Sequence, residues 1–332
     1  MTTLVRHRLI LTGILLLTPA IAALHLFVGQ IDLSIDDYWN GLFSFDKSSV
    51  NEIIARDFRT PRLLMALIAG ACLSVVGLMM QTLFNNPLAG PYVLGINSGS
   101  SLFVALSIMT GVPFFASDFG LIINSLFGAF LFGLIILFFS RIVRTQISLL
   151  LIGLMLGSFI SAFVAFLQSA SDAQELKVFT LWALGSLQKV DFDQLAYIVP
   201  IALTGIASTF FIVKPLNALV LGEAEAKLLG INIKTTRLII IILTAILTGL
   251  VTAFCGPIAF VGLAVPNLVR ILFKTQQHLT LIIASVLIGS IFIVLCDILI
   301  QLLEPYFMLP INVLTSIIGA PMVILFILKR LK

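Results

Sequence analysis

The apolar segments of this chain contain few side chains that could carry out acid–base, redox or metal chemistry. Asp297 is the single carboxylate inside a long apolar run, and it lies near the end of that run. Proton and ion relays within membranes are built from several ionisable residues, so the pattern argues against an ion-coupled carrier. The three histidines (7, 25 and 278) are far apart and near the ends of apolar runs, which predicts interfacial positions and no metal site. The three cysteines lie within apolar runs, at spacings that fit neither a zinc site nor a disulfide framework.

Sequence signatures of catalysis and nucleotide binding are absent. The chain contains no GxxxxGK[ST], HExxH, GxSxG or CxxC pattern. The net charge is +4, and no basic cluster is interleaved with aromatic residues, so nucleic acid is not an expected partner. The sequence therefore predicts a protein that is no enzyme and needs no cofactor or metal.

Uncharged polar residues in and around the apolar runs, together with Pro266, are the remaining candidates for contact with a solute. They could line a path that binds a solute weakly, or they could form hydrogen bonds between neighbouring helices. Both interpretations remain open from the sequence. The candidates are Asn85, Asn86, Asn97, Ser98, Ser100, Ser101, Ser158, Ser161, Gln168, Pro266, Asn267, Asn312, Thr315 and Ser316.

The elements that must position these residues are membrane-spanning helices. Hydrophobic residues make up 60% of the 332 residues and charged residues only 10%, whereas soluble domains carry about 25% charged residues. Nine apolar runs have spanning length. A tenth run, 257–272, is short at about 24 Å and includes Pro266 and Asn267. The nine are 9–29, 62–82, 95–112, 119–139, 147–168, 194–213, 238–255, 279–300 and 310–328.

The distribution of Lys and Arg decides between nine and ten spans. These residues favour cytoplasmic loops. Ten spans with a cytoplasmic N-terminus place 13 of the 19 basic residues in the cytoplasm. Nine spans would place most of the basic residues outside the cell. We therefore expect ten spans, both termini in the cytoplasm of a cell-membrane protein, and a short or broken tenth helix covered by other protein or lining a cavity. The 13 are Arg6, Arg8, Arg141, Arg144, Lys214, Lys227, Lys234, Arg237, Arg270, Lys274, Lys329, Arg330 and Lys332.

Three connecting segments are long enough to have structure of their own. The outer segments 30–61 and 169–193 carry most of the acidic residues, and the second includes the helix-like FTLWALGSL. The inner segment 214–237 contains LNALVLGEAEAKLLG, with Gly230 suited to end a helix. An apolar face could form from Leu216, Leu219, Ala226 and Leu229. This helix could lie in the lipid headgroups, or it could dock into a soluble partner.

Five sequence blocks together resemble one protein family. They are RTPRLLMALIAGACLSVVGLMMQTLFNNPLAGPYVLGINSGSSL, FTLWALGSL, LNALVLGEAEAKLLG, GPIAFVGLAVPNLVR and LPINVLTSIIGAPMVIL. Their order and spacing are similar to those of the FecCD family of ABC importer permeases, which take up ferric siderophores, haem and cobalamin.

The resemblance implies a fold and a set of partners. The expected fold is an all-α integral membrane protein similar to the cobalamin permease, a type II importer, with residues 1–332 as a single permease domain. The family pairs two permease subunits around a central path. Two cytoplasmic ATPase subunits and an extracellular substrate-binding lipoprotein complete the transporter. The expected cargo is an iron chelate, in the first place a ferric siderophore, with haem, cobalamin or an ion-coupled carrier as alternatives.

The resemblance also assigns candidate sites. Residues 216–230 correspond to the pair of coupling helices that contact the ATPase, with Leu219, Leu221, Gly222, Glu223, Ala226 and Gly230 as the expected contact and turn residues. Arg59 and Arg62, with Arg56 as an addition, correspond to arginines that dock the binding protein. Alternatively, they anchor the helix end.

Two positions depart from the family pattern. Asn267 stands where the family has histidine, and Gln301 stands where many members have arginine. We interpret the second departure as a loss of basic docking contacts, which a different second subunit could supply.

Overall fold

The structure is a computed structural model that describes residues 3–109, 118–143 and 145–331, and this part of the chain is all-α without strands. The predicted fold class is confirmed. Residues 110–112 of the expected third span, and Arg144 and Lys332, lie outside the described residues. The helices are α1 Thr3–Phe27, α2 Ile35–Phe43, α3 Val50–Ile53, α4 Thr60–Leu83, α5 Ile96–Met109, α6 Asp118–Ile142, α7 Gln146–Ser169, α8 Ala173–Ala183, α9 Leu195–Phe211, α10 Val213–Leu219, α11 Glu223–Leu228, α12 Ile233–Cys255, α13 Val261–Phe273, α14 His278–Leu303 and α15 Ile311–Leu331.

Ten of these helices coincide with the ten predicted spans. Within the described residues, eight are long and apolar enough to cross a membrane: α1, α4, α6, α7, α9, α12, α14 and α15. The other two, α5 and α13, are shorter apolar helices of 14 and 13 residues. The short α13 was expected from the run 257–272, since 13 residues reach only about 20 Å.

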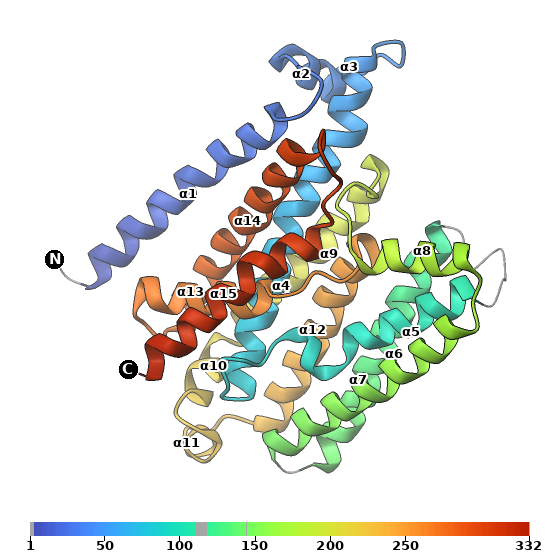
Figure 1. Ribbon diagram of the computed structural model, residues 1–332. Helices are drawn as coiled ribbons and strands as arrows, with labels where there is room; N and C mark the ends of the chain where they lie inside the picture. The colour runs from blue at the N-terminus through green and yellow to red at the C-terminus, as the bar shows by residue number, and fades with distance from the viewer. Residues whose placement is uncertain (1–2, 110–117, 144, 332) are drawn as a thin grey trace.

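The start of α1 and the end of α15 lie on the face that carries α10 and α11, which we call the α10 face (Figure 1). Near the start of α1, His7 Nε2 lies 2.7 Å from the carbonyl oxygen of Phe273 at the end of α13. The backbone N–H of His278, which begins α14, donates to Asn217 of α10 at 2.8 Å. Bringing both termini to one face requires an even number of crossings, in agreement with ten spans.

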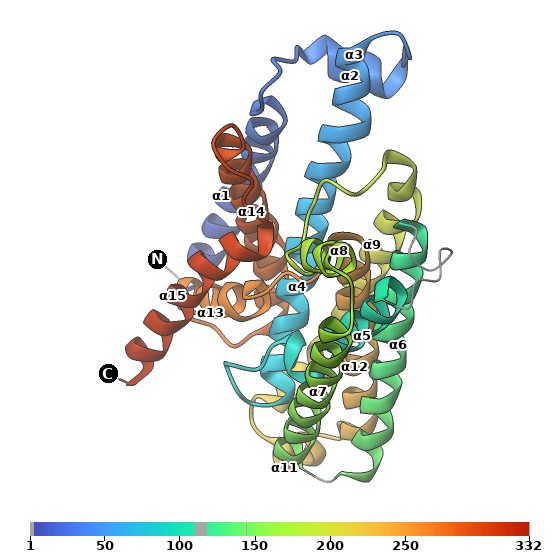
Figure 2. The ribbon, with the colours of Figure 1, turned by 45° about the vertical axis from the view of Figure 1, so that its right-hand side comes forward.

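The helix α4 forms the centre of the bundle (Figure 2). Of 18 consecutive residues in its apolar stretch, 83% are buried, compared with 6% of those in α1 at the periphery. Glycines allow its neighbours to approach closely: a Cβ on Gly77 would lie 1.8 Å from the Gly262 carbonyl oxygen of α13, and one on Gly70 would lie 2.0 Å from that of Gly289 on α14. Small residues at such crossings are typical of packed membrane helices.

The opposite face, which we call the α2 face, is covered by short helices (Figure 1). Ser34 caps α2, and its backbone N–H donates to the Asp37 carboxylate at 2.7 Å, which holds the pKa of Asp37 below its usual range. A π-helical turn, Ile54–Arg59, joins α3 to α4.

The helix expected over FTLWALGSL is only partly present. The helix α8 ends at Ala183, and Gly185 follows with a φ of +75°. The next backbone N–H, of Ser186, donates to the Cys255 carbonyl at 2.8 Å, so this segment leaves the helix to pack against the end of α12.

Candidate functional site

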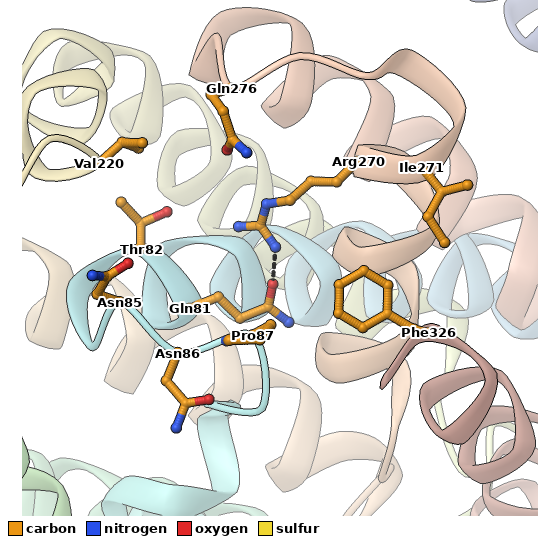
Figure 3. A pocket seen from close by; sticks show the side chains of 10 residues that line it. All are labelled: Gln81, Thr82, Asn85, Asn86, Pro87, Val220, Arg270, Ile271, Gln276 and Phe326. Carbon is orange, nitrogen blue, oxygen red and sulfur yellow. Dashed lines mark hydrogen bonds between the residues drawn. The ribbon is translucent and has the colours of Figure 1, made fainter. Parts of the chain in front are cut away.

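A polar cavity of about 460 Å³ lies at the α10 face, where the end of α4 meets α13, α15 and the turn after α10 (Figure 3). Arg270 of α13 reaches across it and donates a hydrogen bond to Gln81 Oε1 of α4. The lining residues are Gln81, Thr82, Asn85, Asn86, Pro87, Val220, Arg270, Ile271, Gln276 and Phe326.

The broken character of α13 explains why Gln81 lies here. Pro266 has no backbone N–H, so the carbonyl of Gly262 lacks its usual helical partner. The Gln81 side-chain amide donates to the carbonyls of Gly262 at 3.4 Å and Leu263 at 3.3 Å. The expectation that other protein covers the freed backbone groups of this short helix is confirmed.

Asn267 fastens the turn after α4 to the same helix. Its amide nitrogen donates to the carbonyl of Pro87 at 3.0 Å and to that of Leu263 at 2.9 Å, and the side chain is buried. The asparagine in place of the family histidine thus has a structural role at the cavity. On the same turn, Asn85 adopts a positive φ of 44°, a conformation that asparagine tolerates well.

Residues 213–230 form two short helices, with glycines at the turns. Gly222, at a φ of +118°, separates α10 from α11. After α11, Gly230 N–H donates to the Lys227 carbonyl and Ile231 N–H to the Ala226 carbonyl, each at 3.0 Å. This is the Schellman arrangement with glycine in the left-handed position, so the prediction that Gly230 ends the helix is confirmed.

The surface that the helix pair presents differs from the apolar face expected from the sequence. Leu219 and Ala226 are buried against the bundle, as is Leu216, whereas Leu229 is exposed. Of all residues in the pair, Leu228 is the most exposed leucine at 89%, followed by Leu221 and Leu229. The turn at Gly222 splits the predicted continuous face, so it cannot act as one docking surface.

Glu223 also points inward. Its carboxylate pairs with Arg237 Nη2 of α12 at 2.9 Å and accepts a hydrogen bond from the Gln146 amide of α7 at 3.1 Å. Arg237 donates in addition to the backbone carbonyls of Ser140 and Val143 at 3.3 and 3.4 Å. Glu223 therefore anchors α11 to the bundle.

The arginines expected at the α2 face have different environments. Arg59 is buried and donates to the backbone carbonyls of Leu26 and Ile31, which matches the interpretation as a helix anchor. Tyr38 packs beside it, and burial raises the pKa of this phenol. Arg56 is partly exposed, and its guanidinium lies 4.1 Å from the centre of the Phe45 ring.

Arg62 belongs to a buried polar cluster that the sequence did not predict. Its Nε and Nη2 donate to the two carboxylate oxygens of Asp297 at 2.7 and 2.9 Å. His25 Nε2 lies 2.6 Å from Asp297 Oδ2, and the Gln301 amide lies 2.9 Å from the same histidine nitrogen. His25 lies in the last turn of α1, at a span end as expected, but its side chain is buried within the bundle at 1% exposure. Gln301 likewise serves this cluster and offers no surface contact.

The predicted path residues do not gather at one site within the chain. Asn85 and Asn86 line the cavity, whereas the buried Asn97 accepts a hydrogen bond from Thr252 at 3.0 Å, as expected for contacts between helices. Four more buried or half-buried candidates bond within the bundle: Ser100 to the Ser125 carbonyl, Asn312 to Ala259 N–H, and Thr315 and Ser316 to the Asn312 carbonyl.

The candidates on α7 are placed differently. Ser158 and Ser161 are exposed, and their hydroxyls donate to carbonyls of their own helix at 3.0 and 2.9 Å. Gln168 is half-buried near the end of the same helix, and Ser98 Oγ lies near Gly157 of α7. The exposed face of α7 is thus a second, separate group of candidates.

Comparisons with known proteins cover nearly the whole chain. The model of the FecCD transport family matches residues 14–329. The chain is 34% identical over 338 residues to the hemin transport system permease protein HmuU of Yersinia pestis, covering 98% of this chain and 97% of that protein. It is 33% identical over 331 residues to the molybdate import system permease protein MolB of Haemophilus influenzae, covering 97% and 96%.

The fold is similar to that of a solved transporter. A metal-chelate type ABC transporter in an inward-facing conformation superimposes with a TM-score of 0.85 at 30% identity, covering 96% of this chain and 99% of that chain. Together with the family match and the close relatives, this agreement confirms the resemblance predicted from the five sequence blocks. The chain belongs to the FecCD transport family.

Proposed function

We propose that this chain is the membrane-spanning permease subunit of an ABC importer that carries an iron chelate, in the first place a ferric siderophore, across the cytoplasmic membrane. The observation that carries the proposal is the similarity of fold, over 96% of the chain, to a metal-chelate type ABC transporter. The chain has no nucleotide-binding loop of its own, so two separate ATPase subunits would supply the energy.

The α10 face is the surface that we assign to the ATPase, which makes it cytoplasmic together with both termini. Leu221, Leu228 and Leu229 are exposed on the helix pair. Large apolar side chains exposed together mark interaction sites. The buried Leu219 and Ala226 and the glycines at 222 and 230 would hold this surface in shape.

The α2 face is the surface that we assign to an extracellular substrate-binding lipoprotein. Of the three candidate arginines, Arg56 is the most exposed at 27%, with Asp57 3.8 Å away, whereas Arg59 and Arg62 are engaged within the bundle. A carboxylate of the binding protein could pair with Arg56.

The path would run between two permease subunits, either two copies of this chain or this chain and a homologous one. The exposed hydroxyls of Ser158 and Ser161 on α7 would face it, and the cavity with Asn85 and Asn86 would lie toward its cytoplasmic end. Such a path binds its cargo weakly enough to release it.

An iron chelate is the cargo that the relatives favour over the alternatives. HmuU is named for hemin, which is itself chelated iron, and the similar structure is of metal-chelate type. MolB is named for molybdate, so an oxyanion is the alternative that competition experiments should include. A proton- or sodium-coupled carrier is disfavoured, because Asp297, the carboxylate within the long apolar runs, is held in a buried ion pair with Arg62.

Co-purification with the ATPase subunit tests the assignment of the α10 face. The chain should retain the ATPase through affinity purification. Leu228→Glu should abolish retention, because it puts a charge where the ATPase would cover the exposed leucine. Leu42→Glu, at an exposed leucine of α2, is the matched control and should retain the ATPase. Retention by Leu228→Glu, or no retention by the unaltered chain, would contradict the assignment.

A further inference from the structure

One coupling helix is joined to the centre of the bundle through a buried histidine. Asn217 lies on α10, and its Oδ1 accepts the backbone N–H of His278 at 2.8 Å and lies 2.9 Å from His278 Nδ1. The other ring nitrogen, Nε2, lies 2.8 Å from Thr82 Oγ1 in the last turn of α4. His278 begins α14, at a span end as expected, and its side chain is buried at 1% exposure.

The chemistry of these contacts fixes the direction of the hydrogen bond to Asn217. An amide oxygen only accepts, so His278 Nδ1 carries a proton and donates to Asn217 Oδ1. In the neutral ring Nε2 is then an acceptor. The single proton of the Thr82 hydroxyl has two acceptors within reach, His278 Nε2 at 2.8 Å and the Leu78 carbonyl of its own helix at 2.9 Å, and it bonds the histidine when it points to Nε2.

The Asn217–His278–Thr82 contact ends at the wall of the polar cavity. Thr82 lines the cavity, and Asn85 and Asn86 follow it on the turn that closes α4. The second coupling helix, α11, is fastened elsewhere, because Glu223 pairs with Arg237 of α12. Through His278 of α14, α10 therefore has a polar connection to α4, and no such connection from α11 is found among the described residues.

Directional contacts transmit displacement differently from apolar packing. Leu216 of α10 is fully buried, but hydrophobic contact is non-directional and allows one surface to slide over another. Hydrogen bonds weaken steeply when their geometry is distorted, so α10 and the end of α4 will tend to move together.

We propose that Asn217, His278 and Thr82 are positioning residues that carry the movement of α10 to the end of α4 and so to the cavity wall. This inference rests on the proposed function, in which a separate ATPase moves α10 when it binds nucleotide. None of the three residues needs to contact the cargo for this role.

A cysteine reporter on the turn after α4 tests the link without knowledge of the cargo. Leu88 is exposed, and the three native cysteines are buried. In a Leu88→Cys complex with the ATPase in nanodiscs, a non-hydrolysable ATP analogue should change the rate of labelling by a hydrophilic maleimide. Thr82→Val and Asn217→Leu keep side-chain size; the first removes the hydroxyl that contacts His278, and the second removes the oxygen that accepts two hydrogen bonds from it. Thr82→Val should reduce the change about fivefold, the typical weight of one hydrogen bond, and Asn217→Leu by at least as much.

Two further variants separate a positioning role from general loosening of the bundle. Asn217→Asp keeps the accepting oxygen and should preserve the nucleotide response. Ser290→Ala removes a hydrogen bond between α14 and α4, to the Leu67 carbonyl at 2.8 Å, without touching α10, and should also preserve it.

The outcomes distinguish failure of the link from failure of the function. The link is refuted if Thr82→Val and Asn217→Leu respond to nucleotide like the parent complex, or if Ser290→Ala loses the response equally. A parent complex that binds the ATPase and nucleotide without any change in labelling also refutes it. Failure of the unaltered chain to bind an ATPase would instead refute the proposed function.

Discussion

Replacing Asp297 with Asn should destabilise the protein strongly. The carboxylate is 2% exposed and accepts two hydrogen bonds from Arg62, at 2.7 and 2.9 Å, besides its contact with His25. The substitution leaves the largely buried Arg62 guanidinium without its close counter-charge, with only the partly exposed Glu304 carboxylate nearby. Breaking a buried ion pair in this way costs about 3–5 kcal/mol in unfolding free energy.

The same arginine provides a matched control. Glu304 lies 3.9 Å from Arg62 Nη1, but its side chain is 31% exposed. Exposed ion pairs are typically worth about 0–1 kcal/mol. Glu304→Gln, the same chemical change toward the same partner, should therefore cost at most about 1 kcal/mol.

The buried cysteines allow this difference to be measured. Cys72, Cys255 and Cys296 are all buried, so a thiol-reactive dye should report thermal unfolding of the detergent-solubilised protein. Asp297→Asn should lower the melting temperature well below that of Glu304→Gln, and Arg62→Gln added to Asp297→Asn should restore part of the loss. Equal melting temperatures for the two single variants would refute the assignment of the buried pair.

Three further predictions concern the helix crossings and the anchors at the α10 face. Gly77→Ala should cost about 1–3 kcal/mol, because its Cβ would lie 1.8 Å from the Gly262 oxygen. Gly13→Ala, with nothing within 4 Å, should leave the melting temperature unchanged, and equal effects of the two would contradict the packing. Gln81→Leu leaves the Gly262 carbonyl of the broken helix without its donor, whereas the Leu263 carbonyl keeps Asn267. The substitution should cost about 1–3 kcal/mol in the same dye assay; an unchanged melting temperature would show that Gln81 is not needed there. Glu223→Gln and Arg237→Gln should each weaken ATPase retention, and the double variant should be little worse than either, because one contact is lost; additive losses would indicate separate roles.

The spans were predictable because lipid imposes a simple rule on sequence. A segment of about 20 apolar residues crosses, and basic residues mark one side. The short α13 could be identified for the same reason, since Pro266 and a limited apolar length are visible in the sequence. Its partner Gln81 could not be, because the two residues are joined only by the packing of α4 on α13.

The buried cluster around Asp297 escaped prediction for a similar reason. His25 and Arg62 lie in helices far from Asp297 in the sequence, and nothing local connects them. One signal was available: Gln301 is four residues after Asp297, one helical turn away on the same face. The outer arginines were assigned to a partner on family resemblance, and that resemblance does not show which of them the bundle itself uses.

The coupling helices were predicted in position but not in orientation. Leu219 and Ala226 follow a helical period across 216–230, which suggested one continuous apolar face. Gly222, with its positive φ, breaks that period and turns α11 so that Leu228 faces outward. A glycine within a helical run was therefore the feature that decided the surface.

ATP-dependent uptake in proteoliposomes directly measures the proposed import of an iron chelate through this permease. Vesicles should hold the chain, its second permease subunit and the ATPase, with the binding protein loaded with ⁵⁵Fe-labelled ferric siderophore on the outside and ATP on the inside. We expect accumulation of ⁵⁵Fe that requires ATP and is not reduced by excess molybdate. Accumulation driven by a proton or sodium gradient without ATP, or by the chain without an ATPase, would contradict it.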